Sequence, residues 1–277
     1  MFGSDRKMWE TLNGIEIGII LFLQQFQNPV LNFIVKAISF LGNPIFWFFV
    51  AAFLYWRGKK ILGFFCMNII VISSALSGFL KALFMRPRPN LALYNAEWFG
   101  IKEGASFAFP SGHSLLASSF AFFFRNKILL IIACAVAFSR IFLGLHFLSD
   151  VLFGLFLGFI LGYLIFLLKK RMPENFVIST KKEVFLLAIL LILSFLSLIF
   201  FNKFPILGVA LGFYAGFILE INSNIREMNL LKIGIGYLGL LVFSLLALIF
   251  SDILQFIIFF IAGLWVSLLW PRLERKI

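Results

Sequence analysis

The chain has 277 residues, of which 62% are hydrophobic and only 13% are charged. A water-soluble domain is about half apolar and about a quarter charged, so this composition excludes an ordinary soluble fold. A net charge of +12 would suggest nucleic acid as the partner of a soluble protein, but here the basic residues lie mostly in short segments between apolar runs. We therefore expect a membrane protein that has no nucleic-acid partner.

Residues 1–43 form the weakest apolar region of the chain. The stretch 12–26 is interrupted by polar residues such as Glu16, and the stretch 30–40 contains Lys36. These patterns predict one weak span and one amphipathic helix in the membrane interface, although two interfacial helices fit nearly as well. We treat residues 1–43 as a separate N-terminal region.

Uninterrupted apolar runs follow, and they predict helices rather than strands, because a backbone in lipid must satisfy its own hydrogen bonds. The runs of the central region, residues 44–170, are 44–56, 61–85, 113–124, 128–143 and 147–168. The last region, residues 171–277, has four more runs, at 184–201, 206–221, 230–250 and 253–270. The predicted fold class is all-α, a polytopic transmembrane helix bundle.

The charges between these runs indicate an orientation. Basic residues gather at one end of the spans, and this set contains Arg57, Lys59, Lys60, Arg125, Lys127, Arg226, Lys232 and the basic residues of 169–182 and 272–276. Cytoplasmic loops collect lysine and arginine, so we expect this end to face the cytoplasm. Besides Lys203, the outer face receives five cations, which are Lys81, Arg86, Arg88, Lys102 and Arg140. Charges in that position suit an anionic substrate.

Four of these cations belong to, or lie next to, three short motifs that the span count places on the same outer face. The motifs are KALFMRPRP at 81–89, PSGH at 110–113 and SRIFLGLHFLSD at 139–150. The only two histidines of the chain, His113 and His146, both lie in them. Histidine exchanges protons near neutral pH and can act as a nucleophile, so this coincidence indicates catalysis.

The third motif has the residues of an oriented nucleophile. Asp150 follows His146 by four residues, so a helix there places both side chains on one face. A carboxylate at one ring nitrogen fixes the tautomer and leaves the other nitrogen as the nucleophile.

The remaining motif residues are suited to binding an anion. Lys81, Arg88 and Arg140 can bind phosphate oxygens. Ser111 and Gly112 precede a helix, whose N-terminus favours negative charge. Together these groups would stabilise a phosphoryl transition state. Few carboxylates lie near the motifs, so we expect no metal and no cofactor.

The three motifs together resemble the signature of the type 2 phosphatidic acid phosphatase superfamily, also called lipid phosphate phosphatases, which reads K-x6-RP, PSGH and SR-x5-H-x3-D. Every signature position is present in the chain. The resemblance covers about residues 28–170 and implies a six-helix-type phosphatase core, and we assign the catalytic region of that core to 44–170. The four helices expected in 171–277 are accessory, and we assign them no chemistry.

The resemblance implies a role for each motif residue. His146 takes the phosphoryl group, Asp150 orients it, and His113 protonates the leaving alkoxide. The phosphate cradle consists of Lys81, Arg88, Ser111, Gly112 and Arg140. The implied reaction is metal-independent hydrolysis of a lipid phosphate or pyrophosphate in the bacterial plasma membrane, with the site on the periplasmic side and phosphate or vanadate as pocket ligands.

Other interpretations stay open at this point. They are a lipid-to-lipid phosphotransferase, a transporter or scramblase that retains the fold, a phosphatase for soluble substrates and a vanadate-dependent haloperoxidase. The identity of the lipid and the oligomeric state also stay open. Outside the signature positions, we interpret Arg86 and Glu220 as helix-end anchors and the series Gly208, Gly212 and Gly216 as close helix packing.

Overall fold

The structure is a computed structural model that describes residues 2–89, 97–98, 101–102, 107–171, 204–220, 222–223, 227–250 and 252–275. Its first helices are α1 (Phe2–Gln24), α2 (Pro29–Phe40), α3 (Pro44–Trp56), α4 (Lys60–Phe84), α5 (Gly112–Phe124), α6 (Lys127–Phe142) and α7 (Leu148–Arg171). The later ones are α9 (Phe204–Glu220), α10 (Leu230–Ile249), α11 (Asp252–Leu264), the π-helix η1 (Trp265–Leu269) and α12 (Trp270–Glu274). One short antiparallel pair, β1 (Glu97–Trp98) with β2 (Ile101–Lys102), lies between α4 and α5.

The predicted all-α fold class is confirmed, and the chain is a multi-pass membrane protein. Among the described residues, four helical segments are long and apolar enough to cross a membrane, and they are Lys60–Phe84, Leu148–Arg171, Leu230–Ile249 and Ile253–Glu274. The pair α2 and α3 can form a fifth span that bends by 52°. The predicted helix at 184–201 lies outside the described residues.

The described chain divides into two compact units. The first comprises Met1–Trp47 and Ile72–Lys169, and the second comprises Phe48–Val71 and Lys170–Ile277. Every predicted site residue belongs to the first unit. The division into 1–43, 44–170 and 171–277 stays a prediction, while the compact units group the N-terminal helices with the motifs.

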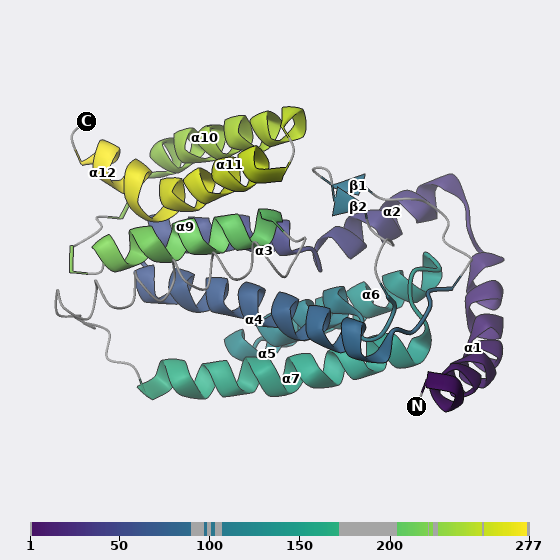
Figure 1. The fold of residues 1–277 in the computed structure, drawn as a ribbon. Coiled ribbons are helices and arrows are strands. Elements are labelled where there is room, and N and C mark those ends of the chain that lie inside the picture. Colours follow the sequence, from purple (N-terminus) through teal and green to yellow (C-terminus); the bar gives the residue numbers. More distant parts are fainter. Residues whose placement is uncertain are drawn as a thin grey trace. The chain divides into compact units, whose positions relative to one another are not determined.

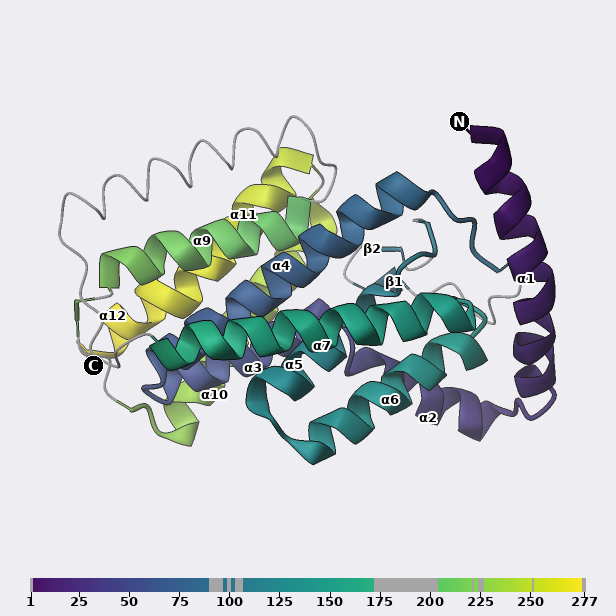
Figure 2. The same ribbon diagram turned by 90° about the horizontal axis from the view of Figure 1, so that it is seen from below.

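Within the first unit, α7 packs against α5 through a series of glycines (Figures 1 and 2). A Cβ atom at Gly154 would lie 2.6 Å from the Ser111 carbonyl oxygen, and Gly158 and Gly162 meet the α5 backbone even more closely. These glycines recur every fourth residue, so they face one side of α7 and let the two backbones touch. The contact places the first turn of α7 beside the first turn of α5.

The N-terminal helix α1 is part of this same unit. Ile20 of α1 is fully buried in an apolar cluster with Ala137, Ile141, Phe147 and Val151. The cluster attaches α1 to the end of α6 and the start of α7, and Figure 2 shows α1 running across that end of α7. The polar interruptions of the 12–26 stretch therefore lie next to the third motif.

In the second unit, glycines of α9 pack against α11. A Cβ at Gly208 would lie 2.7 Å from the Phe256 carbonyl oxygen, and Gly212 and Gly216 are similarly crowded. Close packing at these three glycines is confirmed. The carbonyls of Val266 and Ser267, both in η1, accept hydrogen bonds from the Trp56 indole at 2.9 Å and the Tyr55 hydroxyl at 3.1 Å.

Candidate active site

The segment between α6 and α7 places His146 in the protein interior. Gly144 has φ 67°, a conformation that suits glycine because it has no Cβ, and the chain turns back there. The N–H groups of Leu145 and His146 then donate to the Arg140 carbonyl oxygen at 3.1 and 3.3 Å. His146 is only 1% exposed, so its backbone and side chain are both fixed relative to Arg140.

The imidazole of His146 lies between an acid and a cation. Its Nδ1 is 3.4 Å from Asp150 Oδ2, and its Nε2 is 3.2 Å from Arg88 Nη1. A guanidinium only donates hydrogen bonds, so Nε2 accepts and the ring proton is on Nδ1, facing the carboxylate. Asp150 Oδ2 also accepts from the Phe147 N–H at 2.9 Å, which fixes the carboxylate. This tautomer presents Nε2 as a lone pair.

Three predicted cations act on this imidazole, and Arg88 contacts it directly. Arg88 also donates to the Leu145 carbonyl oxygen at 2.7 Å, Arg140 donates to Ser39 Oγ at 2.6 Å, and Lys81 lies in the last turn of α4. Burial, together with the positive charges of Arg88, Arg140 and Lys81 and the nearby His113, lowers the pKa of His146 well below its usual value. His146 is therefore neutral near pH 7, as a nucleophile must be.

The start of α5 contributes the second motif. Ser111 is the N-cap of α5, where its Oγ accepts from the Ser114 N–H, and its own N–H donates to the Asp150 carbonyl oxygen at 3.0 Å. A Cβ on Gly112 would lie 3.0 Å from Ser77 Oγ on α4, so the residue sits where little room is left. The predicted helix N-terminus thus lies against the His146–Asp150 pair.

The structure brings the predicted residues together to different degrees. His146, Asp150 and Arg88 are in direct contact, and Ser111 and Arg140 join them through backbone hydrogen bonds. Lys81 and His113 lie near enough for their charges to act on His146. Gly112 follows Ser111 as the first residue of α5.

Two residues at the site were not predicted. Arg86 was interpreted as an anchor at a helix end, but that interpretation is wrong, because its side chain is fully buried and donates to Asp150 Oδ1 at 2.5 Å. The Nη2 atom of Arg86 pairs with Glu16 of α1. A signal was present for Glu16, since ionisable residues inside apolar segments are costly and mostly functional.

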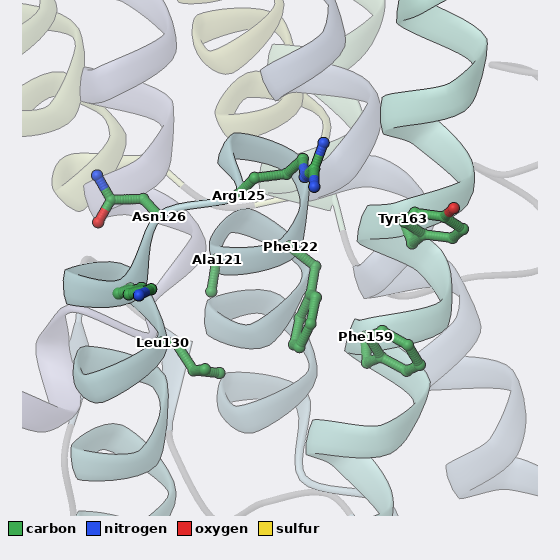
Figure 3. Close-up of a pocket in the computed structure, with 8 residues that line it drawn as sticks. Ala121, Phe122, Arg125, Asn126, Leu130, Phe159 and Tyr163 are labelled. Carbon is green, nitrogen blue, oxygen red and sulfur yellow. The ribbon is translucent and has the colours of Figure 1, made fainter.

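A separate cavity of about 310 Å³ lies at the opposite end of α5 and contains none of the predicted site residues (Figure 3). Phe122, Phe159 and Tyr163 form its walls, and Arg125 and Asn126 lie in the turn between α5 and α6. Since α5 is 13 residues long, about 18 Å separates its two ends. The cavity is therefore distinct from the site around His146.

Among the residues that the structure describes, no three His, Cys, Asp or Glu side chains gather as a metal centre would require. The expected independence of metals stays a prediction.

Comparison with known proteins gives a consistent set of relatives. Residues 62–173 match the PAP2 superfamily. The chain is 26% identical to lipid A 4'-phosphatase of Porphyromonas gingivalis over 178 residues, which cover 58% of this chain and 71% of the relative. It is 29% identical to phosphatidylglycerophosphatase B of Bacillus subtilis over 160 residues, which cover 50% of this chain and 75% of the relative.

One solved structure is also similar, the first transmembrane PAP2 type phosphatidylglycerolphosphate phosphatase from Bacillus subtilis. Its TM-score is 0.48 at 27% identity, and the match covers 59% of this chain and 88% of that one. All three motifs lie within the matched segment 62–173. Residues 62–173 of this chain are therefore a PAP2 superfamily domain.

Proposed function

We propose that this chain is a membrane phosphatase that hydrolyses a lipid phosphate or lipid pyrophosphate through a phosphohistidine at His146. The observation that supports the proposal most directly is the position of the His146 imidazole, with Nδ1 facing Asp150 and Nε2 facing Arg88. The names of the relatives support a lipid as substrate, since lipid A 4'-phosphatase and phosphatidylglycerophosphatase B both act on lipid phosphates.

In the first step, Nε2 of His146 attacks phosphorus. A P–N bond forms as the bond between phosphorus and the lipid oxygen breaks, and His113 gives its proton to that oxygen. Asp150 stabilises the positive charge that appears on the imidazole. The phosphoryl oxygens are bound by Arg88, Arg140, Lys81 and the start of α5. Phosphoryl transfer depends mostly on such positioning and on the stabilisation of the negative charge on these oxygens.

In the second step, water attacks the phosphohistidine. His113, now neutral, accepts a proton from the water as the new P–O bond forms and the P–N bond breaks. Inorganic phosphate leaves, His146 returns to its neutral form, and His113 is protonated again. All of these roles are filled by side chains of the first unit, so the proposal includes no metal and no cofactor.

We place the site on the outer, periplasmic face of a bacterial plasma membrane. The support is the distribution of charge along α5, because Ser111 caps one end at the site while Arg125 and Lys127 lie beyond the other end. By the positive-inside rule that second end faces the cytoplasm, and the site then opens outward. Two of the relatives are bacterial proteins, which agrees with this setting.

The test is phosphate release by the purified protein from a panel of lipids. The panel contains lipid A, phosphatidylglycerol phosphate, a sphingoid-base phosphate, phosphatidic acid and undecaprenyl pyrophosphate, and each lipid is assayed with and without EDTA. We expect release from at least one lipid, loss of release in His146→Ala and competitive inhibition by vanadate. Release that persists in His146→Ala, or that EDTA abolishes, would overturn the mechanism.

A further inference from the structure

Arg86 enters the protein interior directly after α4. Met85 has φ 46° and turns the chain, and the Arg86 carbonyl oxygen accepts from the Ala108 N–H at 2.9 Å. The guanidinium lies between two aromatic rings, 4.7 Å from the centroid of Trp9 and 4.3 Å from that of Phe147. Its side chain is 0% exposed, so water cannot satisfy its donors and protein groups must.

All three guanidinium nitrogens of Arg86 have such partners. Nη1 donates to Asp150 Oδ1 at 2.5 Å and to Ser149 Oγ at 2.6 Å, and Nη2 donates to Glu16 Oε2 at 2.5 Å. Nε donates to Asn13 Oδ1 at 2.9 Å. One planar group therefore connects the carboxylate that faces His146 with two polar residues of α1.

Glu16 makes a second connection to the same turn of α7. Its Oε1 accepts from the Ser149 N–H at 2.7 Å, and its Oε2 accepts from Ser149 Oγ at 3.0 Å. Ser149 directly precedes Asp150, so Glu16 satisfies a backbone donor in the first turn of the helix that presents the catalytic carboxylate. Glu16 is itself only 6% exposed.

The α1 residues in this arrangement lie on one face of the helix. Trp9, Asn13 and Glu16 are spaced by four and three residues, which aligns them, and Ile20 continues the same face into the apolar cluster. Residues 9–20 precede the segment 62–173 that matches the PAP2 superfamily. The match therefore does not include the helix that contacts Arg86.

The charges explain why a second carboxylate is useful. If Arg86 were paired with Asp150 alone, its full positive charge would oppose the stabilisation of a cation on His146. Because Glu16 shares the guanidinium, the three side chains together keep one negative charge beside His146. The guanidinium at the same time fixes Oδ1 of Asp150, so that Oδ2 stays directed at Nδ1.

We infer that Glu16 and Arg86 are positioning residues for the catalytic pair, and that α1 is thereby a working part of the active site. The inference rests on the proposed phosphatase and adds to it a helix and two residues that act on His146 through Asp150. It predicts that Glu16 influences turnover while making no contact with substrate.

The experiment compares Glu16→Gln with Glu220→Gln in the full-length protein. Glu220 is the matched control, because it too is a buried carboxylate paired with arginines, but it belongs to the second unit. We expect Glu16→Gln to lower kcat on the order of tenfold with KM unchanged, as for other supporting residues around a site. We expect Glu220→Gln to leave kcat per folded molecule unchanged. Arg86→Lys, which keeps the charge but loses the planar guanidinium, should have the same effect on kcat as Glu16→Gln.

A second measurement does not need activity. The chain has two histidines, so the His113→Asn variant leaves His146 as the only imidazole, and its ¹⁵N and ¹H resonances can be assigned without ambiguity. We expect the Nδ1–H proton signal in this background to shift on Glu16→Gln, because the Asp150 carboxylate, whose Oδ2 lies 3.4 Å from Nδ1, changes its position, and to stay in place on Glu220→Gln.

The outcomes separate the inference from the function on which it rests. Unchanged kcat and an unchanged Nδ1–H signal in folded Glu16→Gln would overturn the inference while leaving the phosphatase intact. A loss of kcat that only follows the loss of folded protein, as in a structural variant, would overturn it too. If the wild-type protein released phosphate from no lipid, the proposed function would fail, and the NMR shift alone would decide the positioning role.

Discussion

Asp150 in the first unit and Glu220 in the second are both buried carboxylates paired with arginine, and the two differ in what surrounds them. Asp150 in the first unit pairs with Arg86, which is 0% exposed, and its second oxygen faces His146. Glu220 in the second unit pairs with Arg272 and Arg275, which are 54% and 34% exposed, and both of its oxygens are used by arginines and Ser223. Burial and an arginine partner are common to both, so they do not distinguish the carboxylate that we propose for catalysis. What distinguishes Asp150 is that its Oδ2 faces His146.

The largest expected effect is that of removing the charge from Asp150. Asp150→Asn keeps the size of the side chain but can no longer stabilise a cation on His146, so kcat should fall by about 10³–10⁴-fold, as for the aspartate of a serine-protease triad. Glu220→Gln should not change kcat per folded molecule. Initial rates of phosphate release, normalised to folded protein, check both. A Glu220→Gln variant as inactive as Asp150→Asn would remove the distinction between the two units.

The arginines should differ in the same way. Arg88→Lys removes the planar guanidinium that faces Nε2 of His146. We expect kcat/KM to fall by about 10²–10³-fold, which is the usual cost of losing one hydrogen-bond donor to the transition state. Arg272→Lys changes a half-exposed ion pair, which is worth at most about 1 kcal/mol, and activity should not change. Steady-state kinetics and thermal unfolding of the two variants measure the contrast. An active Arg88→Lys would show that this arginine is not part of the cradle.

The glycines offer a contrast in packing. Gly158→Ala would push α7 away from α5, and Gly212→Ala would push α9 away from α11. Each should lower stability by about 1–3 kcal/mol, the usual cost of overpacking. Only Gly158→Ala should also lower kcat, by a few-fold, because it separates Ser111 from Asp150. If folded Gly158→Ala and folded Gly212→Ala had the same kcat, the distance between α5 and α7 would not affect turnover.

The smallest expected effect is that of moderate acidity. The pKa of His146 lies well below 6.5, so the imidazole stays neutral as the pH falls from 7.5 to 6.5, and kcat/KM loses its nucleophile only below that range. A pH profile of kcat/KM, which reports the free enzyme, should show less than about a twofold loss on the acid side over this interval. An acid limb with a midpoint near 7 would contradict the buried, cation-surrounded His146 described above.

The sequence was sufficient to propose the residues that the structure brings together around His146, but not how those residues are supported. Histidine, lysine and arginine are costly in apolar surroundings, so the three motifs were conspicuous against the rest of the chain. Glu16 looked like an interruption of a weak span, because its partner Arg86 lies 70 residues away and only tertiary packing brings the two together. Arg86 was underestimated for the same reason, since no local pattern separates a buried arginine from one at the membrane surface.

The fold shows the same limit. Apolar runs predicted most helices to within a few residues, because the requirement for internal backbone hydrogen bonds acts locally. The predicted runs 30–40 and 44–56 are already separate at the turn residues Gly42, Asn43 and Pro44, but the 52° angle between α2 and α3 and the π-helix η1 were not predicted. The glycines of α7 repeat every fourth residue just as those of α9 do, so a search for that spacing would have found the α5–α7 contact.

The α5–α7 contact also bears on how the protein responds to its membrane. Because glycine brings the two backbones together, main-chain atoms rather than flexible side chains set the distance between Ser111 and Asp150. A helix whose apolar length exceeds the local hydrocarbon thickness accommodates the mismatch by tilting. Two helices joined along their backbones tilt as one rod, so the geometry around His146 is preserved when the bilayer thins or thickens. The same protein can then act in membranes whose acyl chains change in length with growth conditions.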